Sequence, residues 1–347
     1  HLTVTEEDFH TERKVVLEER RLRTEDQPEA YLRERFRAVA FTAQPYHWPI
    51  VGWEADLERL TPADARRFYD RYYRPANAFL VVAGDVARED LMPRLEDTFG
   101  ALPAGEAPPR YRYSDPPQRG ERRLTVRRPA RLPYLLMGYS APNLNDPDGY
   151  ALEVAAAVLS AGRSSRLHRV LVRERELALR AHASHPLLSV DPDLFTLAAQ
   201  PRPGTDLDTL ETALQEQVAD LRETLVSADE LEKAQNQLAA AFVFAQDSLF
   251  YQGMLLAQHE MAGGWRKLDD YLPAVRAVRA EDVQRAARRY LTPERRVVGR
   301  LDPLPLDDAD DVAKPPRRDR EMAPGPGLPR PQPYRCRAGM ASGRLMP

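Results

Sequence analysis

The order of apolar and polar residues divides the first hundred positions into helical segments and one extended segment. Apolar residues recur at intervals of three and four, the spacing of amphipathic helices, at about 9–23, 30–41, 61–73 and 88–99. Residues 77–85 (NAFLVVAGD) form a short apolar run that ends at Gly-Asp, which predicts a buried strand. The first hundred residues therefore predict one buried strand among helices.

The rest of the chain alternates strand patterns with helix patterns. Short apolar or alternating runs predict strands at 122–128, 132–140, 177–185, 194–200 and 296–301. Longer periodic runs predict helices at about 146–160, 164–174, 206–225, 228–262 and 280–290. Together with the first hundred residues, these elements predict an α+β fold.

Proline content marks a boundary between two domains. Residues 103–120 carry five prolines and predict an extended, semi-rigid linker. The linker separates a first domain, residues 1–102, from a second domain, residues 121–305. Residues 306–347 are rich in Pro, Arg and Asp and poor in core-forming residues, which predicts a disordered tail.

Two sequence matches indicate that the domains are copies of one unit. Four residues match four others 218 positions later: Leu60, Asp64, Tyr72 and Pro75 match Val278, Asp282, Tyr290 and Pro293. The run TEEDFHTERKVV, which starts at Thr5, matches SADELEKAQNQL at an interval of 222. Chance similarity between helices is the alternative explanation. We expect a duplicated architecture, with the second copy holding Ala at both positions that correspond to Glu12 and Glu19.

Two carboxylates stand in a stripe of the first predicted helix. Phe9, Glu12, Val16, Glu19 and Arg23 follow a 3-4-3-4 spacing, so they fall on one face of a helix. If this face is buried, Glu12 and Glu19 need a cation, because an unpaired buried charge is costly. The alternative is a solvated helix in which Glu19 and Arg23 form an i,i+4 ion pair.

This helix also carries a family resemblance. The run TERKVVLEERR and the following TEDQPEAYLRERFRAVAFTAQPYHWPIVGW resemble the insulinase, pitrilysin and mitochondrial-processing-peptidase group of zinc metallopeptidases. The resemblance implies that Glu19 is the third zinc ligand and that Glu12 supports it. The family's His-x-x-Glu-His segment, which bears two ligands and the general base, does not occur in these 347 residues. The chain therefore resembles a family member without the beginning of its first domain, so that the first copy of the unit is incomplete and the second complete.

A second resemblance concerns the other domain. AGRSSRLHRVLVRE resembles the family's glycine-containing turn into a helix, after which an Arg, and a Tyr seven residues later, contact the substrate backbone. Arg173 fits the Arg position, whereas Arg180 stands at the Tyr position. The alternative for Arg173 is a solvated cation near a helix end.

Isolated histidines do not add ligands. His47 lies in an aromatic loop, where a packing or hydrogen-bonding role is the commoner one. His182 and His185 have a spacing that holds zinc on a helix, but a strand sends residues three apart to opposite faces.

Composition limits the classes of binding partner that we expect, but it does not determine the cellular compartment. The net charge of −3 gives no reason to expect nucleic acid, and we expect no membrane span because every apolar run is too short. Cys336 is the only cysteine, which excludes an intrachain disulfide. The periplasm and the cell envelope are candidate locations.

The resemblance predicts a portion of a zinc-dependent metalloendopeptidase that cleaves peptides and is inactive alone. Such a portion would contribute the third ligand to one zinc ion and a second domain that encloses the substrate. A homodimer or a heterodimer with a related subunit is compatible with this prediction. The alternative is a non-catalytic scaffold or partner subunit of such a peptidase.

Overall fold

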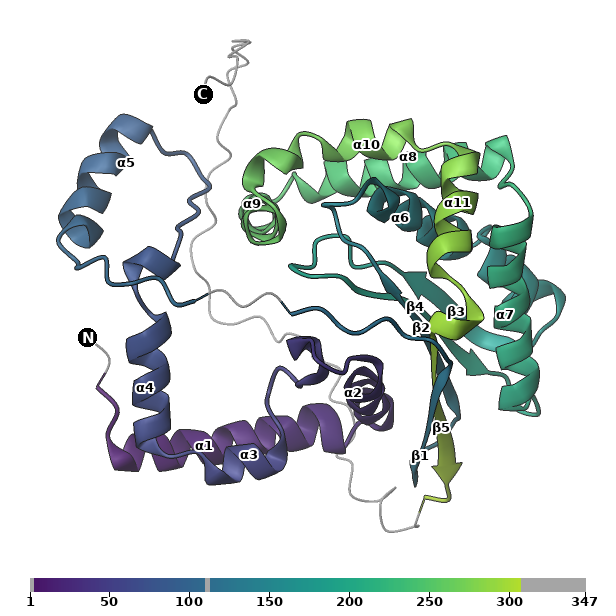
Figure 1. The fold of residues 1–347 in the computed structure, drawn as a ribbon, viewed down its shortest axis with the longest axis horizontal. Helices are drawn as coiled ribbons and strands as arrows, with labels where there is room; N and C mark the ends of the chain where they lie inside the picture. Colours follow the sequence, from purple (N-terminus) through teal and green to yellow (C-terminus); the bar gives the residue numbers. More distant parts are fainter. Residues whose placement is uncertain (1–2, 110–112, 307–347) are drawn as a thin grey trace, which may run out of the picture. The chain divides into compact units, whose positions relative to one another are not determined.

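A five-stranded sheet forms the core of the second half of the chain (Figure 1). In this computed structural model, which describes residues 3–109 and 113–306, the strands lie in the order β1-β5-β2-β4-β3. Their bounds are Arg122–Pro129 (β1), Tyr134–Ala141 (β2), Ala178–Ser184 (β3), Asp193–Pro201 (β4) and Arg296–Leu304 (β5). All five strands were predicted at these places.

The last strand, β5, lies between β1 and β2. It runs parallel to β1 and antiparallel to β2, and the pairs β2–β4 and β3–β4 are antiparallel. The predicted α+β class is confirmed, and the sheet is mixed. The reason is geometric: β1 and β2 run in opposite directions, so a strand inserted between them must be parallel to one of them.

Helices of the second half cover one face of this sheet. They are α6 (Pro147–Ser160), the π-helix η5 (His168–Glu174), α7 (Leu207–Glu223), α8 (Ala228–Ala245), α9 (Leu249–Ala262), the short η6 (Trp265–Leu268), α10 (Tyr271–Ala277) and α11 (Ala280–Tyr290). Leu135, Met137 and Tyr139 of β2 point into the core beneath these helices. The predicted single helix 228–262 is wrong, because the chain turns after α8, where Gln246 and Asp247 bond back to Val243 and Phe244.

Helices also make up the first half, as predicted. They are α1 (Glu6–Arg20), the π-helical turn η1 (Arg21–Glu25), α2 (Pro28–Ala40), α3 (Glu54–Arg59), α4 (Pro62–Tyr72), α5 (Arg88–Leu95) and the π-helical turn η4 (Glu96–Gly100), with short 3-10 turns at Pro45–His47 (η2) and Pro75–Asn77 (η3). A Thr61–Asp64 capping box starts α4. The strand predicted at 77–85 is wrong for the described structure, because this extended segment has no strand beside it.

Helix α2 covers the face of the sheet that the other helices leave free. Leu32 and Phe36 pack against β2 and β5 in a second core, separate from the one under α6 and α7. Phe36 lies over two glycines in adjacent strands: a Cβ at Gly138 or at Gly299 would come within 2.8 Å of its ring. A helix of the first half therefore completes the core of the second half.

The contacts divide the chain into two units, His1–Pro305 and Leu306–Pro347. The predicted disordered tail falls, apart from Leu306, outside the described residues. Among the residues that are described, no helix is both long and apolar enough to cross a membrane.

Candidate functional site

One side of helix α1 is anchored by a buried arginine. Nη1 of Arg20 donates to Glu34 and to the carbonyl of Gly52, each at 2.7 Å, and Nη2 donates to Glu34 at 3.0 Å and pairs with Glu25 at 2.9 Å. The hydrogen bonds that Arg20 donates to the Glu34 carboxylate raise the pKa of Arg20 above its usual value. Local charge spacing does not reveal this burial of Arg20, because its partners Glu34 and Gly52 lie far along the chain.

A second arginine, Arg13, fixes the same helix at its middle. Nη1 of Arg13 donates to the backbone carbonyls of Glu58 and Leu60, at 3.0 and 3.2 Å. These bonds hold α1 against α3 and the start of α4. The orientation of α1 about its own axis is therefore set by Arg13 and Arg20.

Glu12 and Glu19 lie on the face of α1 that these anchors leave exposed. Both are on one helix, as predicted, about 10 Å apart along its axis. Glu12 is exposed and makes no hydrogen bond or ion pair with the described residues. Oε1 of Glu19 pairs with Nη1 of Arg23 at 2.9 Å, and the two side chains are 40% and 73% exposed. Within the described residues this face is solvated, and the alternative ion pair is formed.

The fit of a metal to these residues is partial. Among the residues that the structure describes, no group of three or more His, Cys, Asp or Glu side chains is placed to hold a metal ion. Glu19 and Glu12 offer carboxylate oxygens alone, which are hard donors that zinc accepts together with imidazole. The donor set on α1 therefore suits part of a zinc site.

Arg173 is exposed near the end of η5 and makes no hydrogen bond or ion pair with a described residue. Its guanidinium is thus available to a ligand. Arg180, at the position where the family has Tyr, is engaged: it donates to Glu29 of α2 at 2.6 Å and to Gln200 at 3.1 Å. The two positions therefore differ in role, and Arg180 ties β3 to α2.

His47 has the hydrogen-bonding and packing role expected for it. Nδ1 of His47 bonds to the carbonyl of Gln44 at 2.7 Å, and its ring lies 4.3 Å from that of Trp48. In the other pair, His182 is exposed whereas His185 is buried, so the two rings face different surroundings. Burial lowers the pKa of His185 to about 4. A shared metal at these two rings is not supported.

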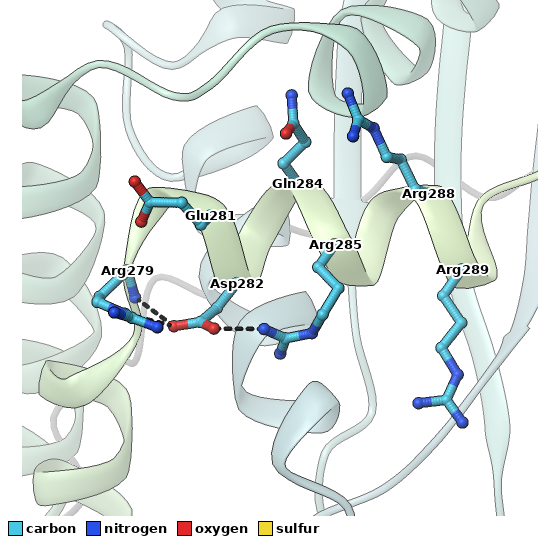
Figure 2. Close-up of a pocket in the computed structure, with 7 residues that line it drawn as sticks. All are labelled: Arg279, Glu281, Asp282, Gln284, Arg285, Arg288 and Arg289. Atoms are coloured by element: carbon cyan, nitrogen blue, oxygen red, sulfur yellow. Dashed lines mark hydrogen bonds and ion pairs between the residues drawn. The ribbon is translucent and has the colours of Figure 1, made fainter.

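An open pocket runs along α11 (Figure 2), and its charged groups other than Glu281 make hydrogen bonds or ion pairs with described residues. Asp282 accepts bonds from the backbone N–H of Arg279 and from the guanidinium of Arg285. Arg285 and Arg289 also donate to the buried Asp148 at the start of α6, at 2.7 and 3.0 Å. These contacts tie α11 to α6, so we interpret this cluster as structural.

The chain is similar to proteins that are named zinc proteases. The Helicobacter pylori zinc protease PqqE is 29% identical over 292 residues, which cover 83% of this chain and 66% of that protein. An uncharacterized zinc protease of Mycobacterium tuberculosis, Rv2782c, is 28% identical over 290 residues, with 82% and 65% coverage. The chain thus spans about two thirds of the length of these relatives.

Solved structures share the fold of this chain. The crystal structure of a protease from Helicobacter pylori matches with a TM-score of 0.83 at 28% identity, over 87% of this chain and 74% of that one. The periplasmic protease PqqL from Escherichia coli matches with a TM-score of 0.70 at 17% identity, which shows a shared fold; the match covers 90% of this chain and 36% of that one.

The family follows from the sequence itself. The profile of the peptidase M16 inactive domain matches residues 59–238, more than half of the chain. The protein belongs to the M16 peptidase family, which confirms the predicted resemblance to insulinase-type zinc metallopeptidases. The match begins after α1, so the roles of Glu12 and Glu19 are not tested by it.

Proposed function

We propose that this chain is part of a zinc-dependent metalloendopeptidase that cleaves peptides. In this proposal Glu19 is the third zinc ligand, Glu12 orients Glu19, and Arg173 contacts the substrate backbone. The observation that carries the proposal is the division of α1 into two sides: Arg13 and Arg20 anchor one, and both carboxylates lie on the other. The division into domains 1–102 and 121–305, with a linker between them, remains part of the proposal.

The second copy of the unit supports this assignment. Helix α8 corresponds to α1 at the interval of 222, and Ala234 stands where α1 has Glu12. Ala234 is buried in the core that α6 and α8 share. By analogy, a helix equivalent to α6 would cover Glu12 in a complete first copy. A carboxylate on a covered face needs a cation, and a metal ion bound by histidines of the covering helix would supply one.

The donor atoms on this chain determine what it would contribute to the proposed zinc site. Zinc bound by two His and one Glu retains a position for water, lowers the pKa of that water and polarises the peptide carbonyl. This chain contributes the oxygen of Glu19, and Glu12 would restrict its orientation, as carboxylates around metal ligands do. The ion pair of Glu19 with Arg23 is exposed and worth about 0.3–0.5 kcal/mol, so a metal can displace it. Without imidazole donors and a general base the chain alone is expected to be inactive.

The test compares zinc affinity and peptide turnover in this chain and in the complete gene product. Only the complete protein should bind zinc tightly and cleave a quenched peptide. In that protein, Glu19→Gln should lose the metal, and Glu12→Gln should weaken zinc affinity by roughly 10- to 100-fold. Glu18→Gln is the matched control, because Glu18 is exposed, pairs with Arg21 at 3.0 Å and should leave affinity unchanged. Chelator-sensitive cleavage by this chain alone would refute the proposal.

A scaffold or partner subunit is the second candidate, and the match to an inactive domain favours it. The residues encoded before His1 separate the two candidates. A His-x-x-Glu-His motif there supports the enzyme, whereas an upstream domain without the motif supports the scaffold. We propose the periplasm as the compartment, since a protein of the same fold is the periplasmic protease PqqL.

A further inference from the structure

Arg33 is an exposed cation of α2 that makes no ion pair with the described residues. Its Nη2 donates to the hydroxyl of Tyr134, the first residue of β2. Tyr134 is buried, and burial raises the pKa of its phenol, so the hydroxyl stays neutral and removes no charge from Arg33. The positive charge of Arg33 is therefore not compensated within the described part of the chain.

The carboxylate that the sequence places beside Arg33 is bonded to another arginine. Glu29 lies one turn before Arg33 on α2, which is the spacing of an i,i+4 ion pair. Instead, Oε1 of Glu29 accepts a bond of 2.6 Å from Nη2 of Arg180 in β3. Nε of Arg180 also donates to Gln200, at 3.1 Å, so its guanidinium is oriented from two sides. One carboxylate thus serves two arginines.

Both arginines lie against the same aromatic ring. The Cζ atoms of Arg33 and Arg180 are 5.3 and 5.7 Å from the ring centre of Tyr134. Partial burial and the charge of Arg33 lower the pKa of His182, two residues after Arg180 in β3, so the positive potential extends to that strand. Together with Glu29, the two arginines leave one net positive charge, which attracts an anion.

An open pocket of about 480 Å³ adjoins Arg33, between the first turn of α2 and the connection from β1 to β2. Arg33 and Arg131 are the cations among the residues that line it, and Glu29 is the carboxylate among them. Its apolar wall consists of Ala130, Leu132 and Leu301. A carboxylate on a short apolar stem matches this lining, because its methylene groups can contact the wall while its oxygens reach Arg33. An acidic side chain of a polypeptide has this form.

Helix α2 holds this cluster in a fixed position relative to α1. Glu34, the residue after Arg33, accepts the bonds of 2.7 and 3.0 Å from Arg20 that anchor α1. Phe36 of the same helix packs on the sheet that carries Tyr134. A side chain bound at Arg33 would therefore lie at a constant distance from the candidate carboxylates of α1, as a pocket that selects residues of a substrate requires.

We propose that Arg33, with Arg180 and Tyr134 around it, binds an acidic side chain of the polypeptide substrate. The two carboxylate oxygens would accept parallel N–H bonds from the planar guanidinium of Arg33, the geometry that makes arginine–carboxylate pairs strong. Arg180 contributes its charge while it stays bonded to Glu29. The inference rests on the proposed function for the nature of the ligand, a peptide, whereas binding at this cluster needs no zinc.

Fluorescence anisotropy of this chain in EDTA tests the inference separately from zinc and from cleavage. The probe is an end-blocked octapeptide with a neutral fluorophore and two adjacent glutamates at its centre, and the comparison peptide has glutamines at those places. The glutamate peptide should bind about 3- to 10-fold more tightly. Equal binding of the two peptides, or no saturable binding of the glutamate peptide at about 1 mM, would overturn the inference. If the preference is present but the complete gene product cleaves no peptide, the proposed function fails and this inference stands.

Opposite substitutions in the cluster should change this preference in opposite directions. Arg33→Met keeps the length of the side chain but removes its charge, so the two peptides should bind equally. Glu29→Gln removes the carboxylate that competes for the arginines, so the preference should increase by about 2- to 5-fold. Circular dichroism checks that both variants are folded. A decrease of the preference in Glu29→Gln, or an unchanged preference in Arg33→Met, contradicts the proposal.

Two control variants make the same changes of net charge elsewhere. Arg71→Met removes an exposed arginine that also lies over a tyrosine ring, 5.4 Å from the centre of Tyr72, but whose pocket contains two aspartates. Glu18→Gln removes an exposed carboxylate that pairs with Arg21. Both should leave the ratio of the two affinities unchanged. If Arg71→Met abolishes the preference as well, overall charge and not the cluster at Arg33 determines it, and the proposal is wrong.

Discussion

Replacement of Arg20 by Leu tests how firmly α1, the helix with both candidate carboxylates, is held in place. The substitution removes the charge that Glu34 faces and two bonds to that carboxylate, and the side chain of Glu34 is only 5% exposed. Removal of one partner from a buried ion pair costs about 3–5 kcal/mol, and Arg35, whose Nε lies 3.8 Å from Oε1 of Glu34, compensates the remaining charge only in part. At about 2–4 °C per kcal/mol, the melting temperature should fall by roughly 6–20 °C.

The double variant Arg20→Leu/Glu34→Leu separates the cost of an unpaired charge from the loss of packing. With both charges replaced by apolar groups, most of the loss should be recovered, to within about 1 kcal/mol of the parent. Urea denaturation followed by circular dichroism gives both values. Arg23→Leu is the control, since its exposed pair with Glu19 contributes about 0.5 kcal/mol or less. A cost below about 1 kcal/mol for Arg20→Leu, or an equal cost for the double variant, would refute the reasoning.

Three further predictions concern pH and packing. Burial lowers the pKa of His185 to about 4, so the free energy of unfolding should fall by roughly 3 kcal/mol as pH drops from 6.5 to 4, and His185→Gln should remove that slope in urea melts. Burial raises the pKa of Glu153 to about 7. Part of the residue reaches the surface, but its Oε2 is buried and has no described hydrogen-bond partner. The free energy of unfolding should therefore fall as pH rises from 4.5 to 7, and Glu153→Gln should abolish this fall. If the pH profile of His185→Gln or of Glu153→Gln is the same as that of the parent, the pKa assigned to that residue is wrong. Gly299→Ala should cost about 1–3 kcal/mol through its clash with Phe36, whereas Gly120→Ala, with open space around it, should be neutral in the same assay.

Elements with local determinants could be predicted from the sequence. The Thr61–Asp64 cap and the apolar period of α4 are properties of adjacent residues, and the structure places this helix where the pattern predicts it. Local sequence was not enough to predict the structure of residues 77–85, because an apolar run forms a strand only when neighbouring strands are available. The burial of Arg20 was also hidden, since its partner Glu34 is 14 residues away.

The candidate site, too, could be predicted from the sequence only where local geometry determines it. The spacing of Glu12 and Glu19 predicted their shared face on one helix, which depends on helical geometry alone. Their exposure depends on which side Arg13 and Arg20 anchor, and that is determined by tertiary contacts. The docking of α2 on β5 has the same origin: the glycine that accommodates Phe36 lies far away in the sequence.

Helix α2 belongs to the first half but packs on the sheet of the second half, and this packing restricts movement between the two halves. If residues 103–120 were a hinge, rotation about them would pull Phe36 away from Gly138 and Gly299 and open a buried core. The connecting segment is itself fastened, because Asp115 accepts bonds from three consecutive amides, those of residues 42–44, directly after α2. The two halves are thus interlocked by the packing of Phe36 and by the bonds to Asp115. For any opening that admits a polypeptide, the chain must bend at a place other than the proline-rich connection.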